Sequence, residues 1–134
     1  MLKNTQAGFE ARRVNIQNLQ PMVGDTAILA ARQAVKEIKA EDQVLDYLLA
    51  LTHKTRQSRD LSLGASPRSV VSWLRASKAH AWLHDQRYVT PDNVKAVAVP
   101  LLRHRLLLGP EAQLDGLTTD AVIASLLKQV AVPR

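Results

Sequence analysis

The hydrophobic residues of this chain recur mostly at intervals of three and four positions, which is the spacing of amphipathic helices. Capping residues or prolines stand before most of these stretches and mark where each helix begins. The pattern therefore predicts an all-α fold, a small bundle of about five helices. The predicted helices cover residues 25–39, 41–56, 67–85, 91–106 and 120–130.

Each predicted helix carries one apolar face that we expect to pack into a shared core. These faces hold Ile28, Leu29, Val35 and Ile38 in the first helix, Val44, Leu45, Leu48, Leu49 and Leu51 in the second, Val70, Leu74, Ser77 and Ala81 in the third, Val94, Val97, Ala98, Leu101 and Leu102 in the fourth, and Val122, Ile123, Leu126, Leu127 and Val130 in the fifth. The predicted N-terminal caps are Asp25, Ser66, Thr90 and Thr119.

The first part of the chain differs from the rest in its pattern. Residues 1–24 show weak periodicity and end in Pro21 and Gly24, so we interpret them as a linker. Residues 25–134 then form the helical domain.

Three stretches between the helices carry further expectations. Residues 57–65 are predicted to form a polar loop. Pro100 is expected to bend or break the fourth helix, and Gly109-Pro110 to end it. Short strands near residues 35–40 or 105–108 remain open alternatives.

Composition restricts the class of protein. The chain has 134 residues, of which 46% are hydrophobic and none is cysteine, so one domain can bury a core without disulfides. The missing cysteines exclude thiolate metal sites and a cysteine nucleophile. No apolar run approaches the roughly 20 residues that a bilayer requires, and we expect a soluble, cytoplasmic protein with no membrane partner.

Charge is concentrated in the middle of the chain. Residues 53–105 hold ten basic and three acidic side chains, whereas the flanking segments are nearly balanced. This excess favours an anionic partner, either nucleic acid or a phosphate-bearing ligand. A solvated basic surface without a ligand is the simpler alternative.

Most searches for catalytic or metal-binding motifs are negative. The phosphate-binding pattern G-x-x-x-x-G-K-[ST] is absent, so this chain alone is not expected to hold a nucleoside triphosphate with its magnesium ion. His80 and His84 share one helix face, but two ligands do not make a zinc site, and we expect no metal. Trp73, Trp82 and Tyr88 are better explained by core packing than by base stacking.

The strongest candidate for a binding site is Gly64-Ala65-Ser66-Pro67-Arg68. Ser66 and Pro67 predict the start of a helix, where backbone N–H groups and the helix dipole favour anions. Arg68 would add a forked, permanently charged donor that suits phosphate. A surface arginine after an ordinary cap is the equally good alternative.

Several motifs together resemble the C-terminal lid of MoxR-type AAA+ ATPases. The resemblance is carried by Gly64-Ala-Ser-Pro-Arg68, Tyr88-Val-Thr-Pro-Asp-Asn-Val94 and Leu102-Arg-His-Arg-Leu106, with Leu45-Asp-Tyr-Leu-Leu-Ala-Leu51, Thr55-Arg56 and Val132-Pro-Arg134 fitting the same order. It covers about residues 25–134. One departure stands before the tyrosine, where the family tends to have Gly-Arg-Asp and this chain has Asp85-Gln86-Arg87.

The resemblance implies a small helical lid that follows an α/β nucleotide-binding core. That core would carry the Walker motifs and lie upstream, with residues 1–24 as the connection. Arg68 would be the sensor 2 arginine, which reaches the γ-phosphate of bound ATP. Possible supporting residues are Ser66, Arg56, Arg103 and Arg105.

The resemblance also implies cofactors and partners. The full-length parent would bind ATP and magnesium and hydrolyse ATP, whereas the fragment alone would bind neither and catalyse nothing. Implied partners are the upstream AAA+ core of the same chain, neighbouring subunits of a hexameric ring, and proteins with von Willebrand factor A domains. Family members act as chaperone-like remodellers or activators of protein complexes, and nucleic acid is not expected as a partner.

Two rival functions remain at this point. The chain could be a free-standing basic helical module that binds nucleic acid through residues 53–105. It could also be a protein adaptor with no ligand of its own.

Overall fold

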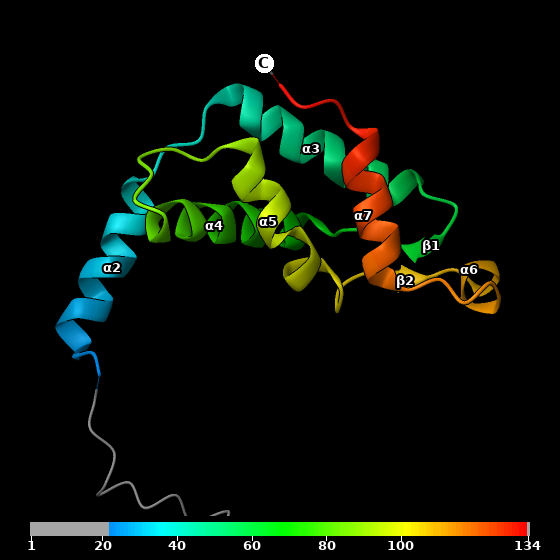
Figure 1. Ribbon diagram of the computed structural model, residues 1–134, viewed down its shortest axis with the longest axis horizontal. Coiled ribbons are helices and arrows are strands. Elements are labelled where there is room, and N and C mark those ends of the chain that lie inside the picture. The colour runs from blue at the N-terminus through cyan, green and yellow to red at the C-terminus, as the bar shows by residue number, and fades with distance from the viewer. Residues whose placement is uncertain (1–21, 134) are drawn as a thin grey trace, which may run out of the picture. The chain divides into compact units, whose positions relative to one another are not determined.

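The computed structural model describes residues 22–133 (Figure 1). The chain divides into two compact units, one that ends at Ala31 and one that covers Arg32–Arg134. The elements are α2 (Asp25–Glu37), α3 (Asp42–Gln57), β1 (Leu61–Leu63), α4 (Pro67–Leu83), α5 (Pro91–Leu102), β2 (Leu107–Leu108), α6 (Pro110–Leu114) and α7 (Thr119–Gln129). The prediction of a helical bundle is confirmed. No helix within residues 22–133 is long and apolar enough to cross a membrane.

Helix α2 differs from its prediction in length and in burial. It ends at Glu37 rather than Lys39, and none of its residues is buried. Ile28 and Leu29, predicted to face a core, are 45% and 61% exposed. Most of the predicted linker, residues 1–21, lies outside the described residues.

The residues after α2 are extended because they pair with a distant segment. The N–H of Val89 donates to the carbonyl of Lys39 at 2.8 Å, within a parallel bridge between Lys39 and Tyr88. Ile38 is buried, as predicted, but it lies in an extended segment and not in a helix. The strand that the sequence left open near residues 35–40 thus appears as a single bridge at Lys39.

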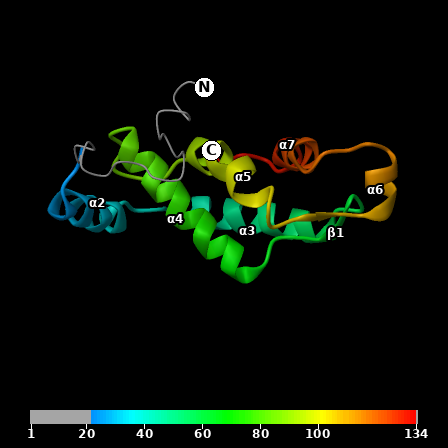
Figure 2. The same cartoon turned by 90° about the horizontal axis from the view of Figure 1, so that it is seen from below.

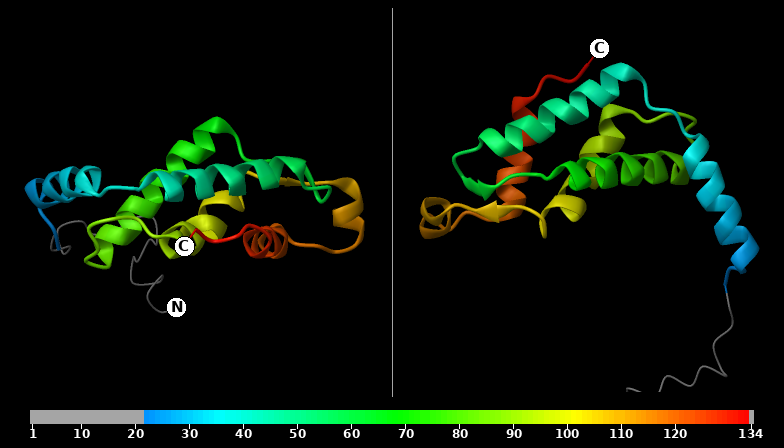
Figure 3. Two further views of the ribbon diagram at one scale, coloured as in Figure 1. Left: turned by 90° about the horizontal axis from the view of Figure 1, so that it is seen from above. Right: turned by 180° about the vertical axis from the view of Figure 1, so that it is seen from behind.

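Four helices form the core of the second unit. Helices α5 and α7 lie against the same side of α3, and α4 crosses α3 obliquely (Figures 2 and 3). The closest packing is between α4 and α5. Small side chains at their contact, Ser77, Ala81 and Ala98, are fully buried and permit this close approach.

Trp73 is the largest fully buried side chain of this core. It lies on α4 with 1% of its surface exposed, and its indole N–H donates to the carbonyl of Val94 on α5 at 2.8 Å. Burial of the ring and this hydrogen bond fix α4 and α5 against each other.

The predicted polar loop at residues 57–65 is wrong in part. Leu61–Leu63 form β1, which pairs antiparallel with β2 at Leu107–Leu108 (Figure 1). Leu61 contributes to the core, whereas Leu63 and Leu107 are exposed. The partner strand is more than 40 residues away in sequence, so no local pattern announces the pairing.

Three helix termini also differ from prediction. Helix α5 ends at Leu102 instead of residue 106, and Pro100 lies inside it without breaking it. Gly109 ends no helix and is the N-cap of the short α6. The cap of α7 is Thr118 and not Thr119, with the Thr118 hydroxyl accepting from Ala121 N–H at 3.2 Å.

The turn after α4 has the pattern of a Schellman C-cap. The N–H of Asp85 donates to the carbonyl of Trp82 at 3.1 Å, and the N–H of Gln86 donates to the carbonyl of Ala81 at 3.0 Å. Asp85 takes the left-handed conformation that this motif requires, with φ of 55°. The family that the sequence resembles tends to have glycine at this position of its Gly-Arg-Asp pattern, and the left-handed backbone of Asp85 gives a conformational reason for that preference.

We expect Asp85→Gly to stabilise the chain by up to about 1 kcal/mol, because glycine adopts positive φ without steric cost. Asp85→Ala should lower stability, since alanine lacks the local hydrogen bonding that lets aspartate tolerate this region. Urea denaturation of the wild type and the two variants measures the order of their stabilities. An alanine variant as stable as the glycine variant would contradict the conformational explanation.

Candidate functional site

The loop that opens α4 is a well-formed helix cap. Ser66 has extended backbone angles, and its hydroxyl accepts a hydrogen bond from Ser69 N–H at 3.2 Å. Pro67 occupies the first helical position, where the absence of an N–H costs nothing. The predicted cap is confirmed.

Arg68 follows directly in the first turn of α4. Its side chain is exposed and forms no hydrogen bond or ion pair with any residue in 22–133. Because Pro67 has no N–H and Ser66 caps that of Ser69, the N–H of Arg68 is left open at the positive end of the helix dipole. A guanidinium without a partner in residues 22–133 and an open N–H therefore belong to one residue at a helix start, an environment that favours an anion.

The same loop is fastened to the last turn of α3. Arg56 Nε donates to the carbonyl oxygen of Ala65 at 2.8 Å, and Ala65 N–H donates to Thr55 Oγ1 at 3.0 Å. Gly64 lies so close to α3 that a Cβ built on it would stand 2.7 Å from the Cα of Arg56. Of the predicted supporting residues, Arg56 and Ser66 are thus brought together with the segment that carries Arg68.

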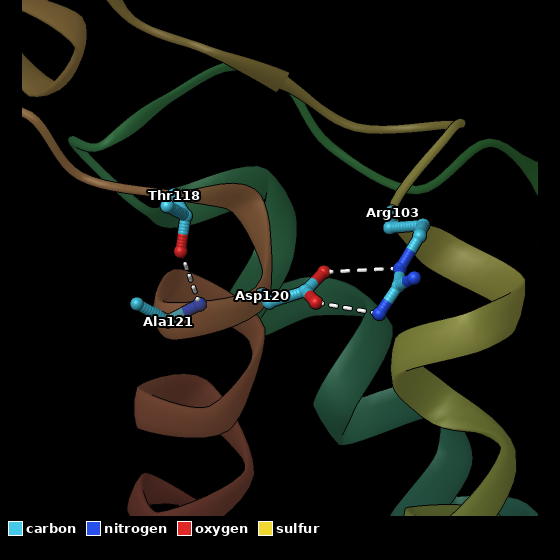
Figure 4. Close-up of polar contacts among 4 residues, drawn as sticks. All are labelled: Arg103, Thr118, Asp120 and Ala121. Atoms are coloured by element: carbon cyan, nitrogen blue, oxygen red, sulfur yellow. Dashed lines mark hydrogen bonds and ion pairs between the residues drawn. The ribbon is translucent and has the colours of Figure 1, made fainter.

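Arg103 lies in a different environment. It forms an ion pair with Asp120 in which Nε and one terminal nitrogen each contact a carboxylate oxygen (Figure 4). The pair joins the end of α5 to the first turn of α7, next to the Thr118 cap. Its side chains are 54% and 46% exposed, so it contributes at most about 1 kcal/mol to stability. Arg103 already has a carboxylate partner in this arrangement.

Arg105 is half-buried and donates from Nε to Nε2 of its neighbour His104 at 3.1 Å. Nothing in residues 22–133 links Arg105 or Arg103 to the Arg68 loop by a hydrogen bond or an ion pair. The positive charge of residues 53–105 is partly neutralised by acidic side chains. Arg103 pairs with Asp120, and Lys95 Nζ lies 3.9 Å from a carboxylate oxygen of Asp92.

His80 on α4 and His84, the C-cap of α4, have structural partners. Their rings stack with centroids 4.2 Å apart, and His80 Nδ1 lies 3.1 Å from the Asn93 amide. Asn93 is buried and also completes the capping box of Thr90 at the start of α5. Within residues 22–133 there is no group of three or more His, Asp or Glu side chains that could hold a metal ion.

The aromatic residues are not all in the core. Trp73 is buried and Trp82 packs partly against the core, as predicted. Tyr88 contradicts the prediction, with 60% of its surface exposed. The bridge to Lys39 turns Val89 inward, and Tyr88, its neighbour in an extended segment, points the other way.

Within residues 22–133, Tyr47 is the titratable side chain whose pKa is shifted. Burial raises the pKa of the Tyr47 hydroxyl, and the negative charge of Asp92 raises it further. The hydroxyl is buried without a hydrogen-bond partner within the described part of the chain. Tyr47 lies on α3 away from the Arg68 loop, and we give it no role in binding.

Sequence reasoning missed what Thr55 and Gly64 do. Thr55 is buried and uses one hydroxyl twice, accepting from Ala65 N–H and donating to the carbonyl of Thr52 at 2.7 Å. Thr55-Arg56 is one of the motifs that carry the resemblance, but the motif alone does not indicate which residues these two side chains contact.

Comparison with known proteins finds related sequences over most of this chain. The family model described as AAA lid domain matches residues 53–126, a range that contains Arg56, the Gly64–Arg68 loop and Arg103. The uncharacterised protein YeaC of Bacillus subtilis is 32% identical over 118 residues, which are 88% of this chain and 37% of YeaC. The chaperone MoxR1 of Mycobacterium tuberculosis is 31% identical in an alignment of 113 positions, which covers 75% of this chain and 30% of MoxR1.

A solved structure matches over almost the whole chain. It is a crystal structure of a protein from Cytophaga hutchinsonii that is assigned as an ATPase, with a TM-score of 0.79 and 26% sequence identity. The match covers 98% of this chain and 44% of that protein. The chain thus spans about a third of the length of the curated relatives described above.

Proposed function

Because the chain belongs to the AAA lid domain family, as the lid of a MoxR-type AAA+ ATPase, we propose that it closes over ATP bound to a nucleotide-binding core of the same polypeptide. The proposal rests chiefly on Arg68, an exposed arginine without a partner in residues 22–133, placed in the first turn of a capped helix. In this role Arg68 is the sensor 2 residue, and residues 1–24 connect the lid to the core.

The residues of the site suit a phosphate group. The guanidinium and the N–H of Arg68 would hold the γ-phosphate of ATP, and the dipole of α4 would favour the negative charge. Bound ATP with magnesium supplies the phosphoryl group that is transferred to water. A fixed cation beside that group stabilises the charge that is spread over its oxygens in the transition state.

The lid is suited to report the nucleotide state as a rigid body. Trp73 fixes α4 to α5, and Arg103 with Asp120 joins α5 to α7. A displacement of Arg68 when the γ-phosphate leaves would therefore move several helices together. In a hexameric ring of the parent protein, this movement would reach the neighbouring subunit.

The parent would use this cycle to remodel or activate protein complexes in the cytoplasm. The name of the relative MoxR1 describes it as a chaperone, which supports a chaperone-like role. Client complexes that include von Willebrand factor A domain proteins are part of the proposal.

We expect Arg68→Ala in the full-length parent to lower the steady-state ATPase rate at least tenfold, a loss of about 1.4 kcal/mol or more in transition-state stabilisation. The matched control is Arg75→Ala, an exposed arginine two turns further along α4, which should change the rate by less than about twofold. An unchanged rate in Arg68→Ala, or an equal loss in both variants, would contradict the assignment of Arg68.

A further inference from the structure

The loop before Arg68 is held by hydrogen bonds from outside α4. Both backbone polar groups of Ala65 bond to side chains of α3, the carbonyl to Arg56 Nε at 2.8 Å and the N–H to Thr55 Oγ1 at 3.0 Å. Ala65 is 1% exposed, so water cannot replace either bond. The last turn of α3 therefore determines where the cap of α4 lies.

The contact with Arg56 depends on one atom of its guanidinium. Nε makes the bond, while the terminal nitrogens form no hydrogen bond within residues 22–133. Lysine has a methylene carbon at the position of Nε, so it keeps the charge and loses the donor at this distance from the backbone. The side chain of Arg56 is exposed, and its removal takes little apolar surface from the core.

We propose that Arg56 is a positioning residue for the nucleotide response, which acts through Ala65 and the Ser66 cap to fix the direction of Arg68. This inference rests on the proposed role of Arg68. Arg68 is three residues beyond Ala65, and Ser69 after it is held by the Ser66 cap, so a shift of the loop moves the first turn of α4 as a unit. A displacement of about 1 Å at a charged group that contacts the reacting phosphate is enough to slow the reaction.

The experiment measures ATPase activity of the full-length parent with Arg56→Ala, Arg56→Lys, Arg68→Ala and the double variant Arg56→Ala/Arg68→Ala. We expect both Arg56 variants to lower kcat by about threefold to tenfold with little change in KM. Both variants leave the buried Ala65 carbonyl without its donor, so the thermal midpoint should fall by a few degrees but stay well above the assay temperature. The double variant should be no slower than Arg68→Ala alone, because Arg56 acts only through Arg68.

Three results would overturn the inference. Wild-type kcat in Arg56→Lys would show that charge and not the Nε donor matters. A loss in the double variant equal to the product of the single losses would show an independent role. A fall in thermal midpoint that accounts for the lost activity would make Arg56 a folding residue. If Arg68→Ala itself leaves the ATPase rate unchanged, the proposed function is wrong. The three results above contradict only the role of Arg56, so the two failures can be distinguished.

Discussion

Replacing Trp73 with alanine will cost about 3–5 kcal/mol of folding free energy, the largest loss that we expect from any single substitution in this chain. The indole is 1% exposed and lies where α4 and α5 pack most closely. Its removal leaves a cavity between these two helices, and Ser77 and Ala81 on the same helix are too small to fill it. Since domains of this size are stable by about 5–15 kcal/mol, the variant should lose a large fraction of its folding free energy.

Two further variants separate the causes of this loss. Trp73→Phe keeps most of the buried ring but loses the hydrogen bond to the Val94 carbonyl, so it should cost about 1–2 kcal/mol. Val71→Ala, at an exposed position of the same helix, should change stability by less than about 0.5 kcal/mol. Urea denaturation followed by circular dichroism gives all three values. A loss below 1 kcal/mol in Trp73→Ala would contradict the central place of this side chain.

The helical part of the fold could be predicted because its signals are local. Ser66 with Pro67 and Thr90 with Pro91 mark helix starts through contacts three residues away, and the structure contains both caps. The β1–β2 pairing joins residues far apart in sequence, and the burial of Ile38 depends on the bridge from Lys39 to Tyr88. Such pairings leave no periodic pattern in either segment, so strands near residues 35–40 and 105–108 were open alternatives whose partners could not be predicted.

The candidate site was predictable in its residues but not in its connections. The cap pattern and the charge of Arg68 identify an anion-favouring helix start from sequence alone. The sequence does not distinguish Arg56 from Arg103, since both are arginines. In the structure Arg56 donates to a backbone carbonyl beside the site, whereas Arg103 pairs with Asp120. Only the packing of α3 against the loop, and of α5 against α7, decides between these environments.

Gly64→Ala should be the most damaging substitution within the site itself, with a cost of about 3 kcal/mol, at the upper end for overpacked positions. The added Cβ would stand 2.7 Å from Arg56 Cα, 2.8 Å from Arg56 N and 2.8 Å from the Thr55 carbonyl oxygen. All three are backbone atoms of the last turn of α3, which cannot rotate away as a side chain could. The loop must therefore move, and both hydrogen bonds to Ala65 would be lengthened or lost.

Gly109→Ala is the matched control for this clash. Its added Cβ would lie 3.4 Å from the nearest atom, the Arg59 carbonyl oxygen, so the change should cost less than about 1 kcal/mol. Urea denaturation of both variants measures the difference, and equal stabilities would show that the α3 backbone yields to the new methyl group. In the full-length parent the same displacement moves the first turn of α4 away from its place against α3. If Arg68 contacts the γ-phosphate as proposed, Gly64→Ala should lower the ATPase rate about as much as Arg68→Ala does, because the arginine remains in the chain but is displaced from the phosphate.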